Sequence, residues 1–149
     1  MSETVKLSHG TCVALGDKAA ILQGAPGSGK SDLALRFIFG TPEDLAPALV
    51  SDDQIRLTVA AGRLIASPPE TIAGRIEVRG IGILAVPFRP QAEVKLLVEL
   101  VAPECVPRLP PSQPPCSTLC GIEIPTLRVA PFEASAHLKL RLALQNAGS

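Results

Sequence analysis

A glycine-rich segment at residues 24–31 carries the strongest chemical signal in the sequence. It follows the pattern GxxxxGKS in full and reads Gly24-Ala25-Pro26-Gly27-Ser28-Gly29-Lys30-Ser31. In such a loop, backbone N–H groups surround a phosphate, the lysine adds a positive charge, and the final hydroxyl can bind Mg²⁺. An apolar stretch precedes this segment and a helical pattern follows it, as the motif requires. The sequence therefore predicts a nucleoside triphosphate site.

Two adjacent carboxylates, Asp52 and Asp53, follow the apolar residues Leu49 and Val50. If these apolar residues form a strand, the pair lies at its carboxyl end, where open α/β sheets bind their ligands. Side chains alternate in direction along an extended chain, so one carboxylate could accept a proton from an attacking hydroxyl while its neighbour faces metal-bound water. A solvated acidic turn or a helix N-cap fits the same two residues equally well.

Three further polar residues are candidates for the same chemistry. Glu77 and Arg79 share one face of a predicted strand that breaks into a glycine turn. Glu77 could bind Mg²⁺ and Arg79 could stabilise phosphoryl charge, but a surface ion pair would show the same spacing. His9, in a Ser-His-Gly turn, is either a solvated turn residue or a catalytic histidine.

Short apolar runs separated by turn residues predict the strands that must position these groups. Three strands joined by tight turns are expected between residues 4 and 24. The other expected strands and hairpins lie at residues 49–51, 55–65, 76–84, 94–101 and 122–129. Six of the thirteen residues from 103 to 115 are proline, which excludes a helix or a central strand and predicts a loop.

Helical spacing of apolar residues is clearest directly after the glycine-rich segment. A helix over residues 31–39, ended by Gly40, should bury Leu33, Ala34, Phe37 and Ile38. A short second helix is expected over residues 41–48, because Thr41-Pro42-Glu43-Asp44 resembles a helix start. A closing helix is expected over residues 134–145. Its core-facing residues are expected to be Leu138, Leu142 and Leu144.

The composition predicts a single globular domain over residues 1–149. Hydrophobic residues make up 46% and charged residues 19%, which suits a packed core. Lys and Arg number 14 and Asp and Glu number 14, and aromatic residues are only 3%, so neither the charge nor the stacking surface of a nucleic-acid binder is present. No apolar run has the length of a signal peptide or membrane span. We expect a cytoplasmic protein that binds neither nucleic acid nor membrane.

The order of the motifs along the chain resembles the catalytic domain of bacterial HPr kinase/phosphorylase. The resemblance rests on His9-Gly10, the loop from Gly24 to Ser31, Asp52-Asp53, and Glu77 with its following glycine turn, and it covers about residues 8–84. It implies an α/β fold of the P-loop kinase type, with a mostly β central sheet flanked by few helices, as in HPr kinase and phosphoenolpyruvate carboxykinase.

In that family, ATP and Mg²⁺ are used to phosphorylate a serine of HPr, the small phosphocarrier protein of the sugar phosphotransferase system. The resemblance implies that Lys30 and the loop amides hold the β- and γ-phosphates. It implies that Ser31 and Glu77 hold Mg²⁺, and that the aspartate pair, Asp53 in the alignment, acts as base toward the serine hydroxyl. His9 matches the active-site histidine of the family.

Two departures from the family bear on the expected activity. The family carries an arginine-rich segment after its late Ile-Pro, whereas residues 129–137 here read VAPFEASAH. The missing arginine argues against the reverse reaction, phosphorolysis with inorganic phosphate. Because His9 lies almost at the start of the sequence, we expect a short form that consists of the catalytic domain without the usual N-terminal domain of the family, and the formation of a homo-oligomer stays open.

The glycine-rich loop by itself also fits two other functions. One is a P-loop kinase that acts on a small metabolite. The other is a nucleotide-responsive binding module that turns over little. The identity of the phosphate acceptor separates the first from a protein kinase, and the absence of phosphoryl transfer separates the second.

Overall fold

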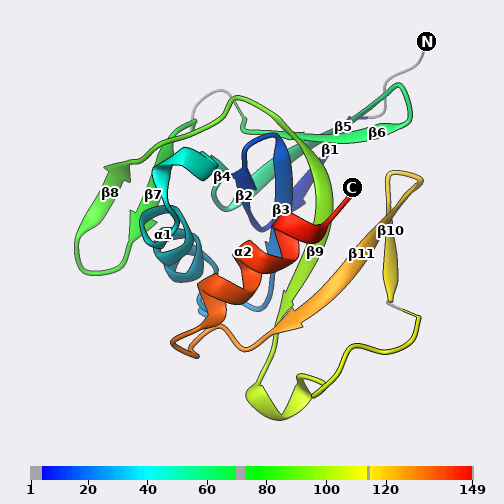
Figure 1. The fold of residues 1–149 in the computed structure, drawn as a ribbon. Helices are drawn as coiled ribbons and strands as arrows, with labels where there is room; N and C mark the ends of the chain where they lie inside the picture. The colour runs from blue at the N-terminus through cyan, green and yellow to red at the C-terminus, as the bar shows by residue number, and fades with distance from the viewer. Residues whose placement is uncertain (1–4, 70–72, 114, 149) are drawn as a thin grey trace.

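The computed structural model describes residues 5–69, 73–113 and 115–148. Within these residues, nine strands form one sheet, in which β1-β5-β6-β9-β3-β2-β4 are neighbours, β11 also pairs with β9, and β10 pairs with β11. A separate pair, β7 and β8, extends to one side (Figure 1). The expected α/β fold, mostly sheet with few helices, is confirmed.

Turns and short loops separate the helices and strands of the described chain. The helices are α1 (Lys30–Gly40) and α2 (Ala136–Asn146), and neither has the length and apolar character needed to cross a membrane. The strands are β1 (Val5–His9), β2 (Thr11–Leu15), β3 (Lys18–Gln23), β4 (Pro47–Ser51), β5 (Gln54–Ala60), β6 (Arg63–Ser67), β7 (Arg75–Val78), β8 (Gly82–Ala85), β9 (Ala92–Leu100), β10 (Cys116–Leu119) and β11 (Ile122–Val129).

Strands β3, β4, β9 and β11 of the large sheet run in one direction. Strands β3 and β9 are parallel, as are β9 and β11. Strand β2 is antiparallel to both β3 and β4, so β4 runs the same way as β3. The carboxyl ends of β4, β3, β9 and β11 therefore meet at one edge of the sheet, which is the edge where ligands bind in α/β folds.

The core has two apolar layers, one on each face of the sheet. In β2, Val13 packs in the layer under the helices, whereas its neighbours Cys12 and Ala14 pack in the layer on the opposite face. This alternation is the two-residue period of a strand that is buried on both faces. Helices α1 and α2 cover the same face (Figure 1). Burial raises the pKa of the Cys12 thiol, which keeps that thiol protonated and unreactive.

Helix α1 buries the four residues expected from the sequence: Leu33, Ala34, Phe37 and Ile38. The prediction for α2 was wrong in its face. Leu144 is buried as expected, but Leu138 is 38% exposed and Leu142 is 54% exposed. The buried stripe is instead Ala136, Leu140 and Leu144, spaced four residues apart. A residue two positions away in a helix points to the opposite side, so burying Leu140 exposes both neighbouring leucines.

This corrected face leads to a test of stability. Replacing the fully buried Leu140 with alanine should lower the free energy of unfolding by about 2–5 kcal/mol, because the substitution removes buried methyl groups and leaves a cavity. The matched variant Leu142→Ala should change it by less than about 0.5 kcal/mol. Urea unfolding of both variants measures the difference. A larger loss for Leu142→Ala would contradict the packing of α2.

Two other segments differ in detail from the sequence-based predictions. The helix expected over residues 41–48 is a single 3₁₀ turn, Glu43–Leu45, because Ala46 adopts a left-handed conformation and β4 begins directly after it. The described part of the proline-rich segment holds one 3₁₀ turn, Pro103–Cys105, and is otherwise irregular, while Pro114 lies outside the described residues. The expected hairpin over residues 55–65 is confirmed.

Candidate active site

The glycine-rich segment forms the loop between β3 and α1, as the sequence predicts. The backbone at Gly27 and Gly29 is left-handed, with φ angles of 77° and 95°. The loop is closed by a hydrogen bond from Ser28 N–H to the Ala25 carbonyl (3.0 Å). These turns place successive amides around one concave surface at the start of a helix, which is a favourable environment for phosphate.

Lys30 lies across this loop. Its Nζ donates hydrogen bonds to the carbonyl oxygens of Gly24 (2.9 Å) and Ala25 (3.2 Å). Both acceptors belong to the first turn of the loop, so the ammonium group is held over the same concave surface as the amides. The positive charge expected from the sequence is therefore at the phosphate-binding turn.

The Asp52 carboxylate accepts hydrogen bonds from three separate parts of the chain. Its Oδ1 accepts hydrogen bonds from the hydroxyls of Ser31 (2.9 Å) and Thr11 (2.9 Å). Its Oδ2 accepts one from the backbone N–H of Glu77 (3.3 Å). The structure thus separates the aspartate pair, because only Asp52 faces the helix start. A carboxylate and a hydroxyl side by side are the oxygen ligands that P-loop enzymes offer to Mg²⁺.

Thr11 was missed by the sequence reasoning. It is 1% exposed, at the first position of β2, and reaches Asp52 because β2 pairs with β4. A lone threonine after a His-Gly turn carries no signal of this role. Only the pairing of β2 with β4 brings it to the site, since Thr11 and Asp52 are 41 residues apart in the sequence.

Asp53 points away from Asp52 and toward His9. Its Oδ1 lies 3.7 Å from His9 Nδ1, and the two side chains are 76% and 81% exposed. Such an exposed pair adds little to the stability of the fold. It is relevant because it lies at the edge of the sheet that carries the glycine-rich loop. Gly10 packs closely against this pair. Its N–H donates to the Asp53 carbonyl (3.1 Å), and a Cβ on Gly10 would lie 2.8 Å from the Leu22 carbonyl oxygen.

Glu77 and Arg79 lie in different elements of the structure. Glu77 belongs to β7 and reaches the site through its backbone N–H, while its side chain is exposed. The sequence suggested that Arg79 shares a strand face with Glu77, and this was wrong. Strand β7 ends at Val78, and Arg79 lies in the exposed turn before β8. Among the described ion pairs, none joins the two side chains.

The candidate site therefore has an ordered layout along the edge of the sheet. The loop and Lys30 lie in the middle, at the end of β3. Asp52, at the end of β4, contacts the helix start, and Asp53 with His9 lies next to it. Within the described chain, no three His, Cys, Asp or Glu side chains cluster as a protein-only metal site. The arrangement suits a metal ion that is shared with phosphates.

Comparisons with known proteins identify a family and several relatives that this chain is similar to. The family described as HPr Serine kinase C-terminal domain matches residues 1–137. A solved structure of the Hpr(Ser) kinase/phosphatase from Coxiella burnetii superposes with a TM-score of 0.78 at 29% identity, covering 95% of this chain and 89% of that one.

Curated relatives are similar over a shorter stretch. HPr kinase/phosphorylase from Clostridium tetani is 37% identical over 79 residues, which is 53% of this chain and 24% of the relative. HPr kinase/phosphorylase from Clostridium botulinum is 36% identical over 78 residues. The matched stretch thus spans about a quarter of the length of these relatives.

Proposed function

This chain belongs to the HPr serine kinase C-terminal domain family, and we propose that it is an ATP- and Mg²⁺-dependent kinase that phosphorylates a serine of an HPr-like phosphocarrier protein. The resemblance seen in the order of the motifs is confirmed by the family match. The observation that carries the proposal is the split of the aspartate pair. Asp52 bonds to Ser31 at the phosphate loop, while the adjacent Asp53 is exposed beside His9.

The groups around the helix start fit a bound nucleotide with its metal ion. Lys30 and the loop amides would hold the β- and γ-phosphates. Ser31 Oγ and the Asp52 carboxylate would hold Mg²⁺ directly or through its water, with Glu77 of β7 as a further carboxylate. The metal ion supplies charge neutralisation to the phosphates when it is bound.

Asp53 is the group best placed to act on the acceptor. Its exposed carboxylate can take the proton of an incoming serine hydroxyl, and His9 at 3.7 Å can orient that carboxylate. Arg79, in the exposed turn after β7, would add positive charge for the transferred phosphoryl group. In this scheme no covalent enzyme intermediate is needed, because positioning and charge neutralisation lower the barrier.

The decisive experiment is a transfer assay with the protein, labelled ATP, Mg²⁺ and HPr. We expect label on a serine of HPr, because both the phosphate loop and an exposed base lie at one edge of the sheet. HPr with that serine changed to alanine is the matched control and should stay unlabelled.

Two outcomes would contradict this function. ATP consumption with a hydroxylated metabolite, but not with HPr, would indicate a small-molecule kinase. Tight ATP binding without single-turnover transfer to any acceptor would indicate a nucleotide-responsive binding module.

A further inference from the structure

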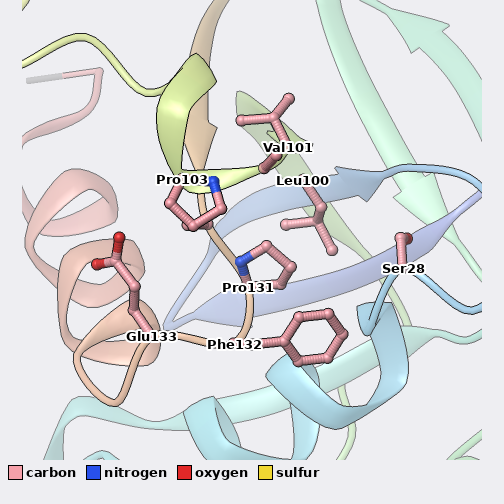
Figure 2. Close-up of a pocket in the computed structure, with 9 residues that line it drawn as sticks. Ser28, Leu100, Val101, Pro103, Pro131, Phe132 and Glu133 are labelled. Carbon is pink, nitrogen blue, oxygen red and sulfur yellow. The ribbon is translucent and has the colours of Figure 1, made fainter.

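A pocket of about 510 Å³ lies next to the phosphate loop, on the side away from the aspartates. It is formed where β9 and β11 end, and Ser28 of the loop is part of its wall (Figure 2). Its other walls are mostly apolar and include Leu100, Pro103 and Phe132, and Glu133 is the one charged residue among them. The volume falls within the range of small-ligand pockets, which is about 300–1,000 Å³. Because Ser28 belongs to both, the pocket and the phosphate loop are continuous.

The order of the strands determines which end of a bound nucleotide would lie toward the aspartates and which toward the pocket. In the sheet, β3 lies between β2 and β9, so the loop at its end lies between the β4 edge with Asp52 and the β9–β11 edge with the pocket. A ligand whose phosphates occupy the loop has its terminal phosphate toward the aspartates and the acceptor. Its other end then extends toward the apolar pocket.

Phe132 forms an aromatic surface at the rim of this pocket. Its side chain is 74% exposed, although it is one of only four phenylalanines in the chain. The ring lies close to the loop, because a Cβ on Gly29 would be 3.0 Å from Phe132 Cε1. Figure 2 shows the ring between Pro131 and Ser28, with the Glu133 side chain turned away from it. An exposed ring at a pocket rim offers a stacking face to a planar group.

The segment that carries Phe132 is held in place from both sides. Arg36 of α1 donates hydrogen bonds to the carbonyl oxygens of Pro131 and Glu133, the latter at 3.1 Å. Glu133 also pairs with Lys139 of α2 at 2.6 Å. The ring is therefore exposed on a fixed backbone, which lowers the entropy lost when a ligand binds to it.

From this geometry we propose that the pocket binds the nucleobase of the nucleotide whose phosphates lie in the loop, with Phe132 stacking on the base. The proposal rests on the proposed nucleotide-dependent function and adds the position of the base to it. Nucleobases are planar and largely apolar on their faces, which matches the walls of the pocket and its aromatic rim.

The test compares ATP with inorganic tripolyphosphate, which has the phosphates but no base. Calorimetry should show tighter binding of ATP to the wild-type protein. Phe132→Ala should weaken ATP binding about tenfold or more, as expected for a lost base–aromatic stack, and leave tripolyphosphate binding unchanged. Phe132→Trp should retain ATP binding, because it keeps an aromatic face.

Two further variants make the result specific. Phe39→Ala removes another exposed phenylalanine, at the far end of α1, and should leave both affinities unchanged. Ala102→Trp, at an exposed wall position, should fill the pocket and weaken ATP binding alone.

Equal affinities for ATP and tripolyphosphate, with no effect of Phe132→Ala, would overturn the base pocket and leave the kinase proposal standing. If the wild-type protein bound neither compound, both proposals would be overturned. If ATP bound normally but HPr stayed unlabelled, the kinase proposal alone would fail.

Discussion

The variant Asp53→Asn is expected to lose at least a hundredfold in the rate of phosphoryl transfer to HPr while binding ATP as the wild-type protein does. A positioned general base contributes about 10²–10⁴-fold to a rate, and Asp53 is the exposed carboxylate next to the site. Asparagine has almost the same shape and tolerates the left-handed backbone at this position, where φ is 73°. The loss should therefore reflect the missing base rather than a changed fold.

Single-turnover transfer from labelled ATP and calorimetric ATP binding measure the two quantities separately. Asp17→Asn, in the exposed turn between β2 and β3, is the matched control, because it removes one carboxylate at the opposite edge of the sheet. It should transfer at the wild-type rate. A variant Asp53→Asn that transfers normally would show that another group, or no side chain, takes the proton.

The variant Asp52→Asn is expected to fail at a different step. It keeps an oxygen that can accept from Ser31 and Thr11, but it loses the negative charge next to the helix start. Groups that position a metal ion typically change its affinity by about 10–100-fold when they are replaced. The Mg²⁺ concentration that gives half-maximal transfer should rise by this factor, whereas Asp53→Asn should leave it unchanged.

This variant also needs a stability control. The new amide N–H₂ would face the Glu77 N–H, which now donates to Oδ2, so two donors would meet without an acceptor. A lost hydrogen bond of this kind costs about 1–3 kcal/mol. Unfolding in urea shows whether the protein remains folded under assay conditions. An unchanged Mg²⁺ dependence in a folded Asp52→Asn variant would contradict the role of this carboxylate.

The features that depend on local sequence could be predicted well. The loop from Gly24 to Ser31 and the buried face of α1 are set by glycine positions and by apolar spacing over one helix. In α2 the same reasoning failed, because leucines at 138, 140, 142 and 144 occur on both sides of the helix. Which side is buried depends on the sheet and on α1, and the spacing alone does not decide it.

The parts of the site that depend on strand pairing could not be predicted. The sequence left open which of Asp52 and Asp53 faces the loop, because the answer depends on the left-handed backbone at Asp53 and on donors from β2 and β7. The pocket next to the loop was also missed. Its walls come from the ends of β9 and β11, which are separated in sequence by the proline-rich segment and the β10–β11 hairpin.

The three hydrogen bonds at Asp52 have a consequence for how this protein can change during evolution. Many catalytic groups weaken the fold that carries them, so that activity and stability oppose each other. Here one carboxylate ties together Thr11, Ser31 and Glu77, from three distant parts of the chain. Selection for a stable fold and selection for the proposed chemistry therefore favour the same residue. Drift at this position should be rare even in descendants that no longer transfer phosphate.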